Sequence, residues 1–211
     1  MKWPDVMALI SREPVFRSSL LLSGTVSTAQ IRLQLARWVQ SGRLIQLRRG
    51  LYVLAPPWRK VEPHPFLMAN ALQPGSYVSQ QSALAFYGLI PEHVPVVTSV
   101  GPGRPETIHN PRGTFQFKHI ARRRGDGYSQ VDVAPTQHAF VAGPEKALLD
   151  LVYLTPEGDS EEYLQSLRLQ NLDTVRTQAL ESLAERSGKP RLIEAARRVV
   201  RMVAHDAGEP L

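Results

Sequence analysis

The sequence contains no cysteine. That absence excludes a disulfide framework, a thiolate metal site and a catalytic thiol. No apolar run reaches the ~18–20 residues that a membrane-spanning helix requires, and the first residues, Met1–Asp5, lack the apolar core of a signal peptide. We therefore expect a cytoplasmic protein that has no membrane partner.

Sequence motifs of common nucleotide and metal enzymes are also missing. The chain has neither the phosphate loop G-x-x-x-x-G-K-[ST] nor the zinc motif H-E-x-x-H. It also lacks a Gly-Ser closely followed by the paired acids with which a nucleotidyltransferase holds its metal. None of the six histidines is spaced i, i+4 from another. We therefore expect no enzymatic activity, no cofactor and no metal. The alternative is an enzyme acting on nucleic acid or nucleotides through scattered residues such as Asp132, His119 and Glu145.

Positive charge is in excess and is unevenly distributed. The 211 residues carry a formal net charge of +6. Residues 1–60 contain 10 Lys and Arg against 2 Asp and Glu, residues 61–150 contain 7 against 7, and residues 151–211 contain 8 against 10. The whole excess lies in the first 60 residues, where it favours binding to a polyanion, above all nucleic acid. On charge alone, a basic surface that serves only solubility is the alternative.

The basic segment begins with two expected helices. Pro4 opens a short amphipathic helix that Pro14 ends. Residues 16–22 are expected to form a second short helix that ends at Ser23-Gly24.

A third helix and a hairpin complete this segment. Ser27 is a favourable N-cap for a helix that extends to about Gln40. Two apolar runs, 44–47 and 51–54, flank the basic turn 48–50, as in a β-hairpin. Helices followed by a hairpin in a basic segment predict a winged helix-turn-helix that binds DNA.

A proline-rich stretch follows and marks a domain boundary. Residues 55–65 contain four prolines, which favour an extended, semi-rigid connection. We predict a winged-helix DNA-binding domain at 1–60 and an α/β domain at 61–211, with a helical tail from about residue 156. The expected helices lie at 65–72, 79–88, 144–154, 160–169, 174–186 and 189–205, and the expected strands at 94–100, 107–109, 114–119, 131–134 and 139–142. The predicted fold class is α+β.

The sequence predicts two specific contacts within residues 61–211. If Gly88 is the left-handed residue that ends its helix, Leu89 packs back on Leu84. On the apolar helix at 144–154, Lys146 and Asp150 are spaced i, i+4 and can pair. The first interpretation is that Glu145, Lys146 and Asp150 anchor the helix end, and the second is that they contact a partner protein.

The candidate DNA-binding residues lie on the third helix and around the hairpin turn. Arginine pairs with guanine, glutamine with adenine, and serine or threonine with phosphate. A helix N-terminus also binds phosphate. The candidates are Ser27, Thr28, Gln30, Arg32, Gln34, Arg37, Arg43, Arg48 and Arg49. The run Arg122–Arg124 extends this surface or is a solvated loop.

Four segments resemble a known family. They read LxRGLYVL at 47–54, YVSQQSALAFYGLI at 77–90, FQFKHI at 115–120 and VAGPEKALLDLVYL at 141–154. In this order they resemble the AbiEi-type antitoxins, the transcriptional regulators of type IV toxin–antitoxin systems, over about residues 5–155. The resemblance implies an N-terminal winged helix that represses its own operon. It also implies a C-terminal domain that opposes a nucleotidyltransferase-like toxin.

These observations together predict a DNA-binding transcriptional regulator that is the antitoxin of a type IV pair. Its expected partners are duplex DNA and a nucleotidyltransferase-like toxin. A stand-alone winged-helix regulator without a toxin is the closest alternative.

Overall fold

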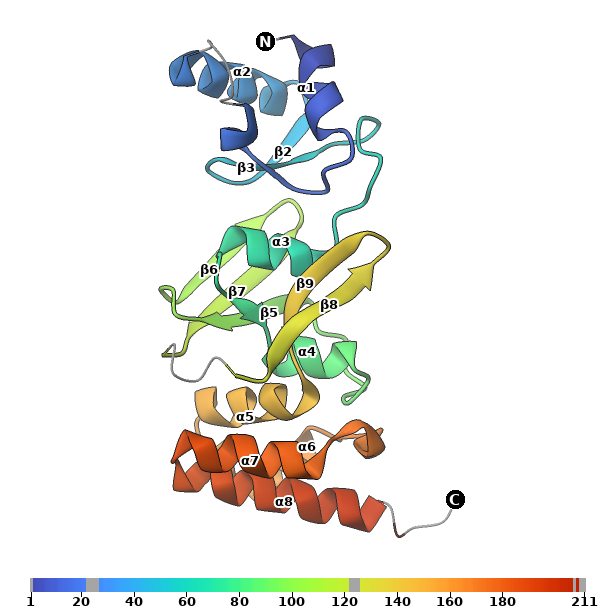
Figure 1. Cartoon of the computed structure of the whole chain (residues 1–211), viewed down its shortest axis with the longest axis vertical. Helices are drawn as coiled ribbons and strands as arrows, with labels where there is room; N and C mark the ends of the chain where they lie inside the picture. The colour runs from blue at the N-terminus through green and yellow to red at the C-terminus, as the bar shows by residue number, and fades with distance from the viewer. Residues whose placement is uncertain (1, 22–26, 122–125, 207, 209–211) are drawn as a thin grey trace.

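A computed structural model describes residues 2–21, 27–121, 126–206 and 208. The chain is mixed α+β, as expected, with a small antiparallel sheet near the N-terminus and a larger mixed sheet behind it (Figure 1). Its layers follow one another along the long axis, so that the two termini lie at opposite ends. Ser23-Gly24 and Arg122–Arg124 lie outside the described residues.

The N-terminal unit, residues 2–61, combines three helical segments with a three-stranded sheet. In chain order its elements are α1 (Trp3–Ile10), β1 (Phe16–Arg17), the 3-10 helix η1 (Ser18–Leu21), α2 (Thr28–Gln40), β2 (Leu44–Arg48) and β3 (Leu51–Leu54). The strand order is β1-β3-β2, with antiparallel neighbours. Val6, Ile10, Leu35 and Trp38 are among the residues of its own core.

The helix expected at 16–22 is wrong in its first half. Phe16 pairs with Tyr52 across β1 and β3, and their rings stack with centroids 5.8 Å apart. Pairing with β3 gives the backbone of Phe16 and Arg17 long-range partners. The helical turn is therefore confined to Ser18–Leu21.

The expected third helix and hairpin are confirmed. The Ser27 side chain accepts a hydrogen bond from the backbone amide of Gln30, at 3.3 Å, and so caps α2. The hairpin turns at Arg49-Gly50, where Gly50 has φ +80°, a conformation that favours glycine.

The second unit, residues 62–206, holds the larger sheet and the remaining helices. Its elements are α3 (Pro65–Leu72), β4 (Tyr77–Val78), α4 (Gln80–Phe86), β5 (Val96–Gly101), β6 (Glu106–Asn110), β7 (Gly113–His119), β8 (Tyr128–Ala134), β9 (Gln137–Ala142), α5 (Pro144–Leu154), α6 (Glu161–Ser166), η3 (Leu172–Thr174), α7 (Thr177–Ser187) and α8 (Pro190–Asp206). At the end of α4, Gly88 has φ +71° and the Leu89 amide donates to the Leu84 carbonyl. The expected helix ending is therefore confirmed.

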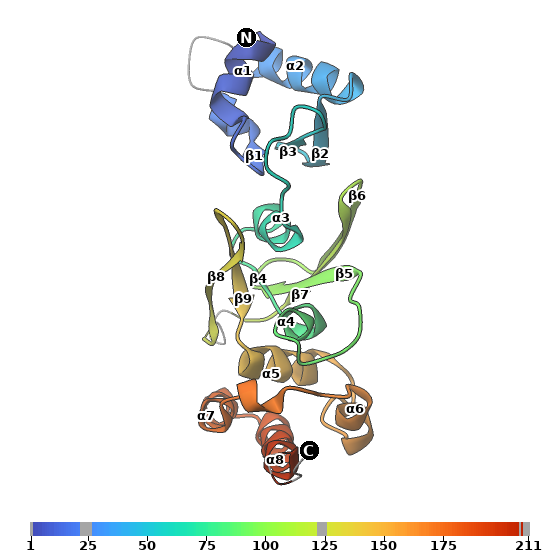
Figure 2. The ribbon, with the colours of Figure 1, turned by 90° about the vertical axis from the view of Figure 1, so that its right-hand side faces the viewer.

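The larger sheet is covered on both faces. Its strand order is β6-β7-β5-β4-β9-β8, with parallel pairs β5–β7 and β4–β9 and antiparallel neighbours elsewhere. Helix α3 lies on the face toward the N-terminal unit, and α4 and α5 lie on the opposite face (Figure 2). The central strand β4 was not expected from the sequence, since it is only two residues long.

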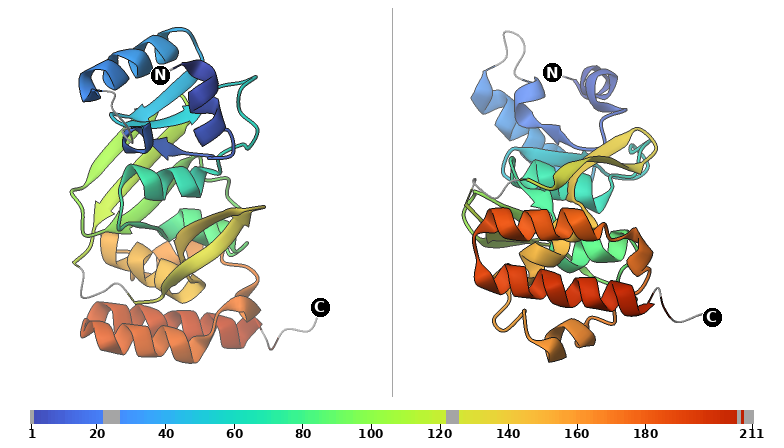
Figure 3. Two further views of the ribbon diagram at one scale, coloured as in Figure 1. Left: turned by 45° about the horizontal axis from the view of Figure 1, so that its top comes forward. Right: turned by 60° about the horizontal axis from the view of Figure 1, so that its bottom comes forward.

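The C-terminal helices form the last layer. Helices α7 and α8 lie side by side and pack against α5 (Figure 3). The buried Glu145 carboxylate accepts hydrogen bonds from the backbone amide of Arg176, at 2.9 Å, and from its Nε, at 3.1 Å. Glu145 thus holds the N-terminal end of α7 against α5. Within the described ranges, no helix combines the length and apolarity needed to cross a membrane.

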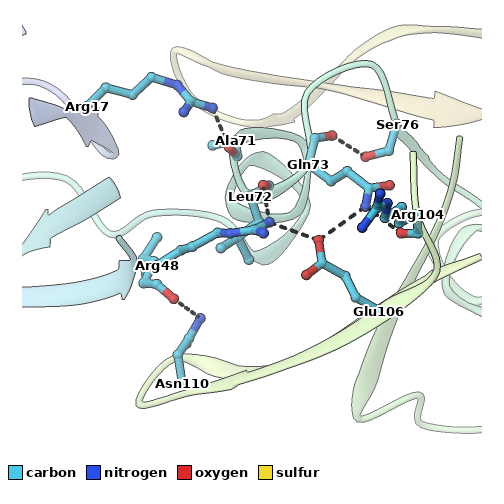
Figure 4. Close-up of polar contacts among 10 residues, drawn as sticks. Arg17, Arg48, Ala71, Leu72, Gln73, Ser76, Arg104, Glu106 and Asn110 are labelled. Atoms are coloured by element: carbon cyan, nitrogen blue, oxygen red, sulfur yellow. Dashed lines mark hydrogen bonds and ion pairs between the residues drawn. The ribbon is translucent and has the colours of Figure 1, made fainter. Parts of the chain in front are cut away.

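The two units meet where the hairpin turn contacts the C-terminal end of α3 (Figure 4). Arg17 Nη2 donates to the Ala71 carbonyl at 2.6 Å, and Arg48 Nη1 donates to the Leu72 carbonyl at 3.3 Å. Arg48 Nη1 also lies 2.8 Å from Glu106 Oε1. The last carbonyls of a helix have no amide partner in the helix and carry partial negative charge. Because α3 has no basic residue in its own last turn, these two guanidinium groups cap it from the other unit.

Two further features extend this interface. The amide Nδ2 of Asn110 donates to the Leu47 carbonyl at 3.3 Å. Leu47, Leu51 and Val53 of the hairpin belong to the same buried cluster as the core of the second unit. Part of the hairpin is therefore shared core, and Arg48 next to the turn contacts α3.

We expect Arg48 and Glu106 to be energetically coupled. Their side chains are 45% and 32% exposed, so a double-mutant cycle of Arg48→Ala and Glu106→Ala should give a coupling energy of about 0.5–1 kcal/mol in urea unfolding. Arg49→Ala combined with Glu106→Ala is the matched control, because no ion pair joins these residues in the described part of the chain. Equal coupling in both cycles would contradict the proposed cap.

Candidate nucleic-acid interface

The outward face of α2 carries most of the predicted DNA-binding residues. Ile31, Leu35 and Trp38 are buried against the unit's core. Successive helix residues are rotated by about 100°, so the intervening positions face solvent. The exposed members are Ser27, Thr28, Gln30, Arg32 and Arg37, whereas Gln34 is half-buried at the edge of this face. The structure thus brings six of the nine predicted residues together on one helix.

The electrostatic setting of this face is uniformly positive. Between Pro14 and Val61 the sequence has eight Lys and Arg and no Asp or Glu. Among the described residues, no ion pair engages Arg32, Arg37 or Arg49, and all three are exposed. A face with unneutralised guanidinium groups and no nearby carboxylate on its own segment attracts polyanions.

Arg43 has an internal partner. Its guanidinium lies 5.3 Å from the ring centroid of Trp3 and 5.8 Å from that of Trp58. The indoles of Trp3 and Trp58 also meet edge to face, with centroids 5.4 Å apart. Arg43 therefore ties α1 to the proline-rich segment by cation–π contact, a role that its position between helix and hairpin did not reveal.

Arg48 also has internal partners, the Leu72 carbonyl and Glu106. Both arginines of the turn are candidates for DNA contact, but Arg48 is engaged within the chain, whereas among the described residues no ion pair engages Arg49. The reason is that the second unit approaches the hairpin from the side of Arg48 and supplies both a carboxylate and a helix end (Figure 4).

A second set of exposed arginines on α8 differs from the face of α2. Arg197, Arg198 and Arg201 all lie within 3.9 Å of Glu194. One carboxylate thus offsets part of their charge, and the surrounding residues 151–211 contain more acids than bases. These arginines thus differ from Arg32 and Arg37 on α2, which no ion pair engages among the described residues.

A buried polar cluster lies at the start of α4 and on α5. Asp150 is 1% exposed and accepts hydrogen bonds from Ser79 Oγ at 2.8 Å and from the Tyr77 hydroxyl at 3.0 Å. The ammonium of Lys146 pairs with the other carboxylate oxygen, so the pairing expected from the i, i+4 spacing is confirmed. Burial raises the pKa of Asp150, against the opposing effects of Lys146 and the two hydroxyl groups.

This cluster anchors the fold. Burial and the neighbouring carboxylate raise the pKa of Tyr77, so its hydroxyl stays protonated and donates. A cavity of about 60 Å³ borders Lys146 and Asp150, well below the ~300 Å³ at which small-molecule pockets begin. The four side chains join β4, α4 and α5, and the role of the PEKALLD segment in packing is thereby explained.

The residues of the enzyme alternative lie apart. Asp132 pairs with exposed His138 at 2.5 Å on β8 and β9, and His119 Nδ1 contacts the Gly103 carbonyl at the end of β7. Strands β7 and β8 are separated by three strands of the sheet. In the described part of the chain, no group of three or more His, Asp or Glu side chains is arranged to hold a metal ion.

Removing one partner of the buried pair should be costly. We expect Lys146→Met to lower the free energy of unfolding by about 3–5 kcal/mol, because Asp150 is left as an uncompensated buried charge. The double variant Lys146→Met/Asp150→Asn should recover much of this loss, since no charge then remains. Urea unfolding monitored by circular dichroism measures both effects.

Arg197→Met, at a largely exposed ion pair, is the control for that experiment and should cost less than about 1 kcal/mol. A loss in Lys146→Met no larger than in the control would show that the pair does not anchor the fold.

Comparisons with known proteins bear on the fold. No protein-family model matches the chain, and no curated protein matches it. The chain is similar to the crystal structure of the RV2827C protein from Mycobacterium tuberculosis, with a TM-score of 0.60 and 18% sequence identity. The likeness covers 97% of this chain and 76% of that one. At this identity it shows that the two proteins share a fold that includes both units and the helical tail.

Proposed function

We propose that the protein is a DNA-binding transcriptional regulator that contacts duplex DNA through the outward face of α2. The observation that carries this proposal is the combination of exposed arginines on α2 with a segment, residues 14–61, that contains no acid. Of the seven arginines in that segment, Arg17, Arg43, Arg48 and Arg59 have partners within the chain. Among the described residues no ion pair engages the other three, Arg32, Arg37 and Arg49, and these are proposed to bind an external anion.

The arrangement of the N-terminal unit supports the same proposal. The order α1–β1–η1–α2–β2–β3, with sheet order β1-β3-β2, is typical of winged-helix units. In such a unit α2 is the helix that enters the major groove, with its first residues nearest the base edges. Gln30 and Arg32 are then placed for base contact, and Thr28 and the capped N-terminus of α2 for phosphate contact.

The hairpin departs from the usual wing. Because Arg48 is bound to α3 and Glu106, only Arg49 of the turn is proposed to contact phosphate. The second unit is proposed to hold the hairpin, so that α2 and Arg49 form one surface.

The resemblance to AbiEi-type antitoxins extends the proposal. It assigns repression to the N-terminal unit and opposition to a nucleotidyltransferase-like toxin to the second unit. A neighbouring reading frame that encodes such a toxin would distinguish an antitoxin from a stand-alone regulator.

Arginine variants of the full chain test the proposed interface. Arg49→Ala should weaken binding to every duplex and reduce the slope of log K against log salt by about 0.9, the value for one phosphate contact. Arg32→Ala should weaken binding mainly to the preferred duplex, by roughly 1–3 kcal/mol, because it removes a base contact. Fluorescence anisotropy over a range of salt concentrations measures both.

The control is Arg186→Ala, an exposed arginine on α7, which should bind as the unmodified protein does. Absence of binding by the full chain at low salt would refute the proposed function. An equal loss in Arg186→Ala would show that binding does not depend on α2.

A further inference from the structure

A leucine on the outward face of α2 is exposed. Leu33 is 55% exposed and lies two positions from each of Ile31 and Leu35, which are buried. At about 100° per residue, two positions turn the side chain by roughly 200°. Leu33 therefore points almost directly away from the core, at the centre of the face that the proposed function places against DNA.

The neighbours of Leu33 on this face are small on one side and polar on the other. Ala29 and Ala36, at i−4 and i+3, are both exposed. Gln30 and Arg37, at i−3 and i+4, flank the leucine on the other side. The centre of the face is thus a short apolar ridge, Ala29–Leu33–Ala36, beside hydrogen-bonding side chains.

The charge of the surroundings identifies the partner. An apolar ridge bordered by both positive and negative side chains would fit another protein. The border here contains Arg32 and Arg37 and lies in a segment without acids. A duplex offers phosphates and base edges for the charged border and, in the major groove, one apolar group for the ridge, the 5-methyl of thymine. The alanines leave room for the helix backbone to come close to the base edges.

We propose that Leu33 recognises thymine methyl groups in the major groove, with Gln30 and Arg37 reading the adjacent base edges. This inference rests on the proposed DNA-binding function and deepens it, since it names the base that the centre of α2 selects. The preferred duplex accordingly contains thymine at the position that faces the middle of the helix.

Replacing thymine by uracil tests this proposal because it removes only the methyl group. A preferred duplex is first selected from a random pool with the full-length protein, and each dT is then replaced singly by dU. At one or two positions dU should weaken binding about fourfold, the effect expected for one buried methyl group. In Leu33→Ala these same replacements should have little effect, because the contact with the methyl group has been removed.

Leu9→Ala, a similarly exposed leucine on α1, is the matched control and should respond to dU as the unmodified protein does. If Leu33→Ala and the unmodified protein respond alike to every dU, the proposed contact is absent although the protein binds DNA. If the unmodified protein binds no duplex at all, the proposed function fails together with this inference. Loss of self-association in Leu33→Ala, with DNA binding unchanged, would assign the ridge to contact between two copies and overturn the proposal.

Discussion

Two arginines of the N-terminal unit cap α3, and this contact determines which arginines of that unit are engaged within the chain. Helix α3 has eight residues and no cation in its last turn, so the carbonyls of Ala71 and Leu72 need external donors. Arg17 and Arg48 supply them, and Glu106 adds a carboxylate for Arg48. The hairpin is thereby turned toward the second unit, and α2 lies on the side of the hairpin away from α3 (Figure 1). One set of contacts thus engages two arginines within the chain, although both stay exposed.

This interface depends on a rigid second unit, which the Asp150 cluster provides. A carboxylate that is 1% exposed is tolerable only because a lysine and two hydroxyl groups surround it. The cluster fixes α5 against β4 and α4, while Glu145 one turn earlier holds α7 through Arg176. All three charged residues of α5, Glu145, Lys146 and Asp150, are buried, and they connect the sheet, the neighbouring helix and the tail.

Elements with strong local signals were predictable from the sequence. The bounds of α5 follow from Gly143-Pro144 at its start, and the start of α2 follows from Ser27 as its cap. Strands β1 and β4 were missed because each has only two residues and exists through pairing with distant segments. A local pattern contains no information on such pairing.

The same distinction between local signals and long-range contacts applies to the candidate site. The outward face of α2 follows from helical periodicity, so its residues were found from the sequence. The partners of Arg43 and Arg48 are Trp3, Trp58 and Glu106, up to 58 residues away in the chain. Composition placed both arginines in a basic segment, but only the tertiary structure shows that they are already engaged.

The central proposal is that α2, together with Arg49 of the hairpin and not α8, contacts DNA. Amide chemical shifts of the full-length protein, recorded during titration with a duplex, test it most directly. The account predicts that the largest changes occur at Thr28, Gln30, Arg32 and Arg37, with the amides of α8 unaffected. Changes centred on Arg197 and Arg201, with those of α2 unmoved, would contradict it.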